Sequence, residues 1–528
     1  MDHLSKFDLS DISTPTLACG AASLALLLAY AKSRRSSRPP KPPGPKGYPI
    51  IGNLFDIPQR RVWEGYKELS EKYGDMVYVE AFGQSILVVS SLKRVKDLFD
   101  KRQNIYSDRP CTPMLVDLMD FGHYMSVMPY DNWYKRHRKV FRQQAEHNVA
   151  AWHPVIKSQA IDFLKSVLAT PENWSVHVKQ LFSATVVEIT YGVKTSSPED
   201  PFTKDMNQVA DGFGEAALPG RFLVDVFPFL KYVPSWLPGA GFKRFAEYYK
   251  DLDHRARNKP FDHVLKAMKA GTSPPCMVSN MVSVLPEEGS PARSEEEQIA
   301  RNVASITHAA GAETSMGTAT AFYVFMALNP EVQRRAQEEL DRVVGPVRLP
   351  EINDREGLVY ITAILKEVLR MHQTTPMALP HSAATDDIYD GYFIPKGTVV
   401  LGNAWQILHD PEVFDEPFAF KPERYIKDGK IDHTVVDATA AAFGYGRRMG
   451  LTRSRDSRIC PGRHMAMDTL FYTIACTLAM FDIAAPKDEN GEPTIRYETT
   501  DGALSHPVPV QCFLTPRSPE HARYIRSL

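Results

Sequence analysis

The pattern of apolar and polar positions predicts a mainly helical chain with a small β part. Two short runs of β-branched residues, at 77–80 and 86–89, are separated by Gly83, which is typical of a hairpin. From about residue 132 to the 370s, apolar positions recur with a helical period. The longest stretch covers residues 294–328 and is apolar nearly all round its middle, so we expect this helix to pass through the core.

Local signals set the expected ends of the elements. Ser294, with Glu297 three residues later, forms a predicted capping box at the start of the long helix, which stops before Pro330. Residues 389–400 alternate around a Pro-Lys-Gly turn and predict a small sheet. We also expect an irregular proline-rich stretch over 411–425, a helix over 464–480, a closing strand over 507–513 and a polar tail over 516–528.

The N-terminus carries an apolar stretch that predicts a membrane anchor. Residues 12–31 are almost free of charge, and a helix needs about 20 apolar residues to span a bilayer. A secretory signal peptide is the alternative, but such peptides begin basic, whereas the charges here are mostly acidic before the stretch and basic after it. Because positive residues stay in the cytosol, we expect residues 1–11 in the lumen and the body of the protein in the cytosol.

A stiff connector follows the predicted anchor. Residues 32–47 are basic and rich in proline, which fixes the backbone and favours an extended chain. No comparable linker or internal repeat occurs later, so residues 48–515 are interpreted as one large domain.

Charge and cysteine content exclude two classes of protein. Lys plus Arg is 62 and Asp plus Glu is 63, a balance that argues against a nucleic-acid partner. The six cysteines are scattered, without zinc-finger or CxxC spacing, so neither a zinc site nor a disulfide framework is expected.

Cys460 stands directly before the last predicted helix, and Pro461 and Gly462 follow it. A helix start presents unpaired N–H groups and a partial positive charge, which lowers the pKa of a thiol and stabilises the thiolate. Gly462 lets the backbone pass close to a flat ligand. From this segment alone, a buried structural cysteine is the alternative interpretation.

The middle of the long helix carries polar residues in an apolar setting. Gly311, Glu313 and Thr314 lie there, and a glycine inside a helix costs about 1 kcal/mol relative to alanine. One explanation is a local opening of the helix where a small ligand and water sit. A polar patch at a contact between helices is the alternative.

The order and spacing of these segments resemble the cytochrome P-450 family over essentially the whole chain. Within the family, residues 234–244 and 505–509 resemble the fungal secondary-metabolite group that contains O-methylsterigmatocystin oxidoreductase and tryptamine 4-monooxygenase. The matching segments are 310–315 (oxygen activation), Glu367 and Arg370 (the ExxR pair) with Arg424 as third partner, and 443–448 with Cys460 and Gly462 (the heme-binding loop).

The resemblance implies the cytochrome P-450 fold, with a long central helix over the heme and an N-terminal membrane anchor, here in the endoplasmic reticulum. It implies heme b (iron protoporphyrin IX) with the Cys460 thiolate as iron ligand, whose electron donation favours O–O cleavage. Glu313 and Thr314 are implied to guide protons to the site of oxygen activation. The implied heme-binding residues are Cys460, Arg458 or Arg448, Phe443, Gly462, Tyr134, Arg138 and His381.

The residues expected to hold the heme propionates depart from the family pattern. The family commonly supplies a Trp and, four residues later, an Arg from an early helix. Here Trp133 is followed at that spacing by His137, and Tyr134 by Arg138. We prefer Tyr134 and Arg138 as the matching pair. His381 is a further candidate, with a plain strand histidine as the alternative.

The implied reaction is insertion of one oxygen atom from O2 into a small lipophilic fungal secondary metabolite, with a terpenoid favoured. Electrons would come from NADPH through a separate reductase, because the chain shows no flavin or dinucleotide fingerprint. Substrate is expected against Ala309 and Ala310, with residues 114–127, 374–379 and 503–505 completing the pocket. Two alternatives stay open, a heme-thiolate isomerase or dehydratase and a degenerate family member without heme.

The segment before Cys460 is longer than the family pattern. The family places the cysteine four positions after the loop glycine, whereas Cys460 follows Gly446 by fourteen. The ten extra residues are 449–458 or, equivalently, 448–457, so that Arg448 or Arg458 serves the propionate. Such an insertion is expected to loosen Phe443 and Gly446 against the sulfur. We interpret it as a splice-boundary error in the gene model or as a lesion that weakens heme retention.

Overall fold

The computed structural model describes residues 39–110, 112–197, 199–218, 220–446 and 458–528. The predicted lumenal segment 1–11, the predicted anchor 12–31 and the start of the hinge lie outside these residues, as do Arg448 and most of the predicted insertion. Within the described ranges, none of the helices is long and apolar enough to cross a membrane.

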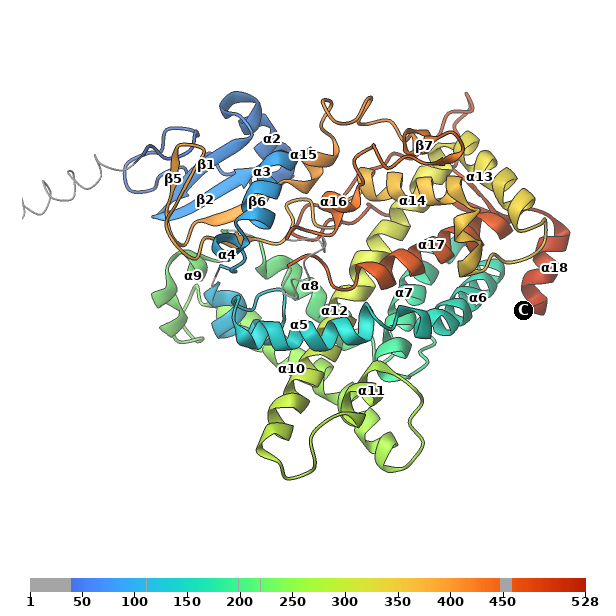
Figure 1. The fold of residues 1–528 in the computed structure, drawn as a ribbon, viewed down its shortest axis with the longest axis horizontal. Helices are drawn as coiled ribbons and strands as arrows, with labels where there is room; N and C mark the ends of the chain where they lie inside the picture. The colour runs from blue at the N-terminus through green and yellow to red at the C-terminus, as the bar shows by residue number, and fades with distance from the viewer. Residues whose placement is uncertain (1–38, 111, 198, 219, 447–457) are drawn as a thin grey trace, which may run out of the picture.

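The fold is mainly α with small sheets, as the sequence predicts (Figure 1). The longer helices are α2 (Val62–Tyr73), α5 (Asn132–Ala145), α6 (His153–Ala169), α7 (Trp174–Tyr191), α8 (Lys204–Ala216), α10 (Gly241–Lys269), α12 (Pro291–Leu328), α13 (Pro330–Val343), α14 (Val359–Met371), α17 (Arg463–Met480) and α18 (Pro519–Ser527). Shorter helices are α3 (Leu92–Val95), α4 (Gln103–Tyr106), α9 (Leu223–Val226), α11 (Met277–Ser283), α15 (Ala404–Leu408) and α16 (Thr439–Ala442).

The largest sheet joins segments that are far apart in the sequence. The predicted hairpin forms β1 (Met76–Ala81) and β2 (Gln84–Val89), with Met76 opposite Val89. Strand β2 pairs in parallel with β6 (Val399–Gly402), which pairs in turn with β3 (His381–Ser382), giving the order β1-β2-β6-β3. The two-stranded sheets are β4 (Asp387–Tyr389) with β5 (Tyr392–Ile394), β7 (Ile426–Lys427) with β8 (Lys430–Ile431), and β9 (Phe481–Ala484) with β10 (Phe513–Pro516).

Helix α12 runs through the middle of the molecule, with α7 along one side (Figure 1). Most of its C-terminal half is buried, which confirms the predicted core helix. Its predicted start is wrong by about one turn. The helix begins at Pro291 after Ser290, because proline already has the backbone angle of a first helical residue and no N–H to satisfy.

The C-terminal end also differs from the prediction. The expected closing strand forms slightly later, at β10, where it pairs with β9 directly after α17. The expected polar tail contains α18, in which His521 and Ile525 are buried. One buried face is enough to dock a short amphipathic helix, and a mostly polar composition hides this signal.

A buried charge network fixes the irregular segment that leads to Cys460, as the sequence predicts for Glu367, Arg370 and Arg424. Arg370 donates two hydrogen bonds of 2.8 Å to the Glu367 carboxylate, and Arg424 Nε lies 3.2 Å from Glu367 Oε1. Arg370 also donates to the carbonyls of Leu408 and Pro417. A buried ion pair is stable only when its remaining polar atoms are also hydrogen-bonded. Here the remaining N–H groups of Arg370 bond to these backbone carbonyls and so hold the irregular segment in place.

Candidate active site

A cavity of about 300 Å³ lies between α12, α5, β3 and the segment that carries Cys460. Cys460, Glu313 and Thr314 all line it, although Cys460 is about 150 residues from the other two in the sequence. Among the other predicted site residues, Tyr134, Arg138, His381, Phe443, Arg458 and Gly462 also line this cavity. The structure therefore brings together all the predicted site residues that it describes.

Two residues, Pro461 and Gly462, separate Cys460 from the first residue of α17, and Gly462 is the N-cap of the helix. Backbone hydrogen bonds from Gly462 and Arg463 lower the pKa of the thiol, but burial raises it more, and the net shift is upward. The helix start therefore acts in the predicted direction, but burial of the sulfur outweighs it, so the predicted net lowering of the thiol pKa is wrong for the protein without metal. A bound metal cation deprotonates a coordinating thiol outright, so the thiolate depends on the metal.

The two flanks of the predicted insertion are joined at its base. The backbone N–H of Cys460 donates to the Phe443 carbonyl at 3.0 Å. The described flanks therefore hold Phe443 beside the cysteine, which argues against the loosening expected there. The two possible alignments offer Arg448 or Arg458 to the heme propionate. Arg458, which the structure describes, lines the cavity and is 7% exposed.

Three arginines from separate segments line the same part of the cavity: Arg109, Arg138 and Arg458. Arg458 donates to the carbonyls of Ser107, Met125 and Met128. Among the described residues, no carboxylate lies within ion-pair distance of these guanidinium groups, and Nε of Arg109 and of Arg138 has no hydrogen-bond partner. Burial, with the charge of Arg458, lowers the pKa of Arg109 to about 9. Buried cations without counter-ions fit a ligand that carries carboxylates.

Tyr134 and Arg138 are the pair that faces the cavity from α5. The Arg458 guanidinium lies over the Tyr134 ring, with Cζ 3.8 Å from the centre of the ring. His137 is turned away, with Nδ1 on the Trp133 carbonyl and Nε2 3.1 Å from Asn302. The geometry thus supports the preference for Tyr134 and Arg138.

His381 is at once a strand histidine and a cavity residue. It lies in β3, where Nδ1 contacts the Tyr106 carbonyl at 2.6 Å and the ring packs on Phe99. Burial and the nearby charges of Arg109 and Arg458 hold the pKa of His381 well below its usual range. A neutral ring can donate a hydrogen bond but contributes no charge to a carboxylate ligand.

Arg109 is a site residue that the sequence analysis missed. It follows a short helical turn and donates to the carbonyls of Leu379 and Pro380, which lie beside β3. No motif marks it, because its position depends on the pairing of distant segments. The nearest sequence signal is its place in Asp108-Arg109-Pro110, where proline favours an extended chain.

We expect Arg109→Gln to lower heme occupancy or retention about 10- to 100-fold, the usual range for groups that support a bound metal centre. Purified protein would be compared for heme per chain and for the rate of heme transfer to an excess of apomyoglobin. Arg102→Gln is the matched control, because Arg102 pairs with Asp387 outside the cavity. Equal heme loss in both variants would contradict the role given to Arg109.

Glu313 and Thr314 lie on an unbroken stretch of α12, so the predicted local opening of the helix is wrong. The Thr314 hydroxyl donates to the Ala310 carbonyl at 2.8 Å and leaves the backbone ladder in place. The glycine at position 311 is explained by helix packing and not by a local opening of α12. A Cβ there would lie 3.1 Å from Val186 Cγ2, so glycine permits the close approach of α7.

The Glu313 carboxyl is buried and faces the cavity. Its side chain is 8% exposed, and burial raises its pKa, with Asp211 adding to the shift and Lys179 opposing it. A carboxyl whose pKa is raised keeps its proton to a higher pH than an exposed glutamate does. Next to a hydroxyl, it is suited to pass protons into the cavity.

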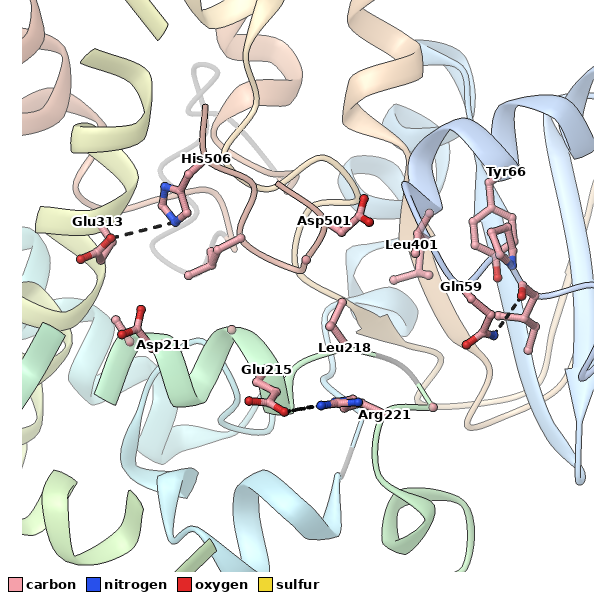
Figure 2. A pocket seen from close by; sticks show the side chains of 18 residues that line it. Gln59, Tyr66, Asp211, Glu215, Leu218, Arg221, Glu313, Leu401, Asp501 and His506 are labelled. Carbon is pink, nitrogen blue, oxygen red and sulfur yellow. Dashed lines mark hydrogen bonds and ion pairs between the residues drawn. The ribbon is translucent and has the colours of Figure 1, made fainter. Parts of the chain in front are cut away.

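A second, more polar cavity of about 540 Å³ lies on the other side of Glu313 (Figure 2). We call it the outer cavity. Glu313 and His506 stand at one end of it, and Gln59 and Tyr66 stand at the other. Asp211, Glu215 and Asp501 also line it, and Glu215 is paired with Arg221 at 2.6 Å.

Two comparisons with known proteins bear on this geometry. The cytochrome P450 family model matches residues 42–513. The chain belongs to the cytochrome P450 family. Its members are oxidoreductases that bind heme b through a cysteine thiolate and use O2, electrons from a redox partner and a lipophilic substrate. Among the cysteines that the structure of this P450 describes, Cys460 is the one that lines the cavity.

Curated relatives are fungal cytochrome P450 monooxygenases. The monooxygenase COX1 of Coprinopsis cinerea is 41% identical over 488 residues, which cover 91% of this chain and 92% of that protein. COX2 of the same fungus is 40% identical over 522 residues, covering 98% and 97%. Tryptamine 4-monooxygenase of Psilocybe cyanescens is 36% identical over 505 residues, covering 94% and 97%. The resemblance to the fungal group is thereby confirmed.

Proposed function

We propose that this P450 inserts one oxygen atom from O2 into a small lipophilic metabolite of fungal secondary metabolism, with a terpenoid favoured. One observation carries the proposal: Cys460 and the pair Glu313–Thr314 open into the same cavity. Large apolar side chains line much of the remaining wall: Phe182, Val186, Phe213, Ile306, Leu369 and Leu504. Such a wall binds an apolar substrate by removing its surface from water.

The predicted pocket segments contribute unequally. Ala309 and Ala310 line the cavity, as does Leu504 from the segment 503–505. From 374–379 the lining residues include Thr374 and Leu379, and from 114–127 they are Tyr124, Met125 and Ser126. Met114 and Met119 instead pack into a separate apolar cluster with α8 and α10.

The residues of this chain hold the cofactor and handle protons around it. Heme, when bound, supplies the chemistry that activates O2, and Cys460, Arg109, Arg138, Arg458 and Tyr134 would hold it. At the cavity wall, burial raises the pKa of Glu313, and Thr314 presents a hydroxyl beside it. The apolar wall excludes bulk water, so protons enter at these groups.

Electrons are proposed to come from NADPH through a separate cytochrome reductase, since the chain lacks a flavin or dinucleotide fingerprint. The test is incubation of the protein with reductase, NADPH and candidate metabolites under ¹⁸O₂, followed by mass spectrometry. A product heavier by one ¹⁸O atom supports the monooxygenase. A product without the label supports the isomerase or dehydratase, and no heme in the protein supports the degenerate alternative.

Attachment to the endoplasmic reticulum membrane, with the catalytic domain in the cytosol, is also a proposal. An exposed apolar patch supports it. Large apolar side chains are exposed in two described segments, at Tyr48, Ile50 and Phe55 and at Leu223, Phe229, Tyr232 and Trp236. Both segments lie against the β1–β2 hairpin, where Phe82 contacts Phe227 at 5.1 Å. Exposed patches of this kind mark membrane or protein contacts.

Removal of residues 1–38 is expected to release the protein only partly from membranes and to leave heme binding intact. The reason is that the exposed patch remains on the shortened chain. The measurement is fractionation of microsomes at low and high salt, with the heme spectrum of both fractions. Complete release at low salt would contradict the contribution of the patch, and an N-glycan on the catalytic domain would contradict the cytosolic orientation.

A further inference from the structure

Glu313 stands in the wall between the two cavities. It lines both, together with Ala210 and Leu504. Among the described residues, the His506 ring faces this carboxyl group, with Nε2 4.0 Å from Oε2, and the two form an ion pair only when the ring is protonated (Figure 2). The carboxylate that faces the oxygen site therefore has an imidazole at its other side, at the end of the outer cavity.

The position of His506 is set by its own backbone. Its N–H donates to the Thr500 hydroxyl at 3.0 Å, and its carbonyl accepts the Thr500 N–H at 2.8 Å. The preceding residue, Ser505, donates its N–H to the Thr374 carbonyl at 2.8 Å. These bonds hold the loop over α12, so the ring does not need its contact with Glu313 to stay in place.

The other ring nitrogen of His506, Nδ1, lies close to polar side chains above Gly317. His506 Nδ1 is buried without a hydrogen-bond partner, and a Cβ at Gly317 would lie 3.0 Å from it, 3.2 Å from Thr374 Oγ1 and 3.4 Å from His372 Nε2. The Thr374 hydroxyl donates to the Thr314 carbonyl, so its oxygen is left to accept. His372 Nε2 also lies 3.3 Å from that hydroxyl, so no hydrogen bond fixes the tautomer of His506, and the neutral ring can present the lone pair of Nε2 to Glu313.

Burial and the charges around the ring favour its neutral form. Burial lowers the pKa of His506, and Lys179 on α7 lowers it further. Asp211 on α8 raises the pKa of Glu313, and His372, whose pKa burial lowers to about 3, is neutral as well. A neutral imidazole beside a carboxyl group can accept a proton and hand it on without leaving a lasting buried charge.

We propose that His506 supplies Glu313 with the protons that the reaction consumes, and takes them from the outer cavity. The inference rests on the monooxygenase reaction proposed above, in which substrate, O2, two electrons and two protons give hydroxylated product and water. In each transfer, Nε2 of His506 takes a proton from a hydronium ion of the outer cavity, which becomes water. Because Nε2 and Oε2 are 4.0 Å apart, the imidazolium then passes that proton through one bridging water to the Glu313 carboxylate and returns to neutral imidazole. His506 thus acts through Glu313, as a positioning residue.

The first test compares His506→Gln, Glu313→Gln and the double variant, with the exposed His433→Gln as control. His506→Gln is expected to keep its heme and its substrate affinity. Product per NADPH should fall about 10- to 100-fold, and the solvent deuterium isotope effect on turnover should rise. Because the two residues act in series, the double variant should be no worse than Glu313→Gln alone. Unchanged coupling in His506→Gln, or additive losses in the double variant, would overturn the proposal.

The second test needs neither substrate nor turnover. In ¹⁵N-histidine-labelled protein, as the diamagnetic reduced carbonyl complex, the His506 signal is assigned by its loss in His506→Gln. Glu313→Gln should change the pH titration of this signal and leave that of His433 unchanged. An unaltered His506 titration would refute the relay. Failure to find any oxygenated product would instead count against the proposed function.

Discussion

Cys460→Ser is expected to yield a folded protein without the thiolate-type Soret band in its reduced carbonyl complex and without oxygenase activity. Serine cannot supply the electron-rich sulfur that favours O–O cleavage. The fold should persist, because Cys460 donates its backbone N–H to the Phe443 carbonyl whatever its side chain is. The measurement is the reduced carbonyl spectrum, together with circular dichroism to check the fold.

Cys276→Ser is a matched control for this substitution. Cys276 also stands at a helix start, where its sulfur accepts the Ser279 N–H, and serine is a good residue at such a position. The control should keep the thiolate-type band. A thiolate-type band in the Cys460→Ser protein would show that the iron ligand has been misassigned.

Thr314→Ala is expected to keep substrate affinity and to divert electrons from product into hydrogen peroxide. General acid–base assistance is typically worth about 100- to 10,000-fold, so the ratio of product to peroxide should fall by about 100-fold or more. Helix α12 should stay intact, because it is unbroken at this residue and alanine is a good helix former. NADPH consumed, peroxide and product are measured together.

Thr320→Ala serves as the control on the same helix. Thr320 also donates its hydroxyl to the carbonyl four residues back, at 2.9 Å, but it does not line the heme cavity. Its coupling of NADPH to product should equal that of the unaltered protein. If Thr314→Ala is equally well coupled, the hydroxyl has no part in proton delivery.

The parts of the fold that the sequence predicts are those with local signals. The β1–β2 hairpin follows from Gly83 between two β-branched runs, and α17 from its apolar length. The network of Glu367, Arg370 and Arg424 was predictable from spacing and family resemblance together. These features depend on residues close in sequence or on a motif.

The predictions that failed depend on packing. Gly311 is set by the approach of Val186 from another helix, and the pKa of the Cys460 thiol by burial that outweighs the helix start. Arg109 reaches the cavity through contacts with Leu379 and Pro380, which are 270 residues away or more. No local pattern carries such information, because it arises only when distant segments meet.

The central claim is that this chain, as its sequence stands, assembles a heme-thiolate site around Cys460. The most direct test is the heme content and reduced carbonyl spectrum of the full chain beside a version that lacks residues 449–458. The joined flanks at Phe443 and Cys460 predict a thiolate-type band and comparable heme occupancy in both proteins. Heme binding by the shortened chain alone would contradict the claim and would identify the ten residues as a lesion or a gene-model error.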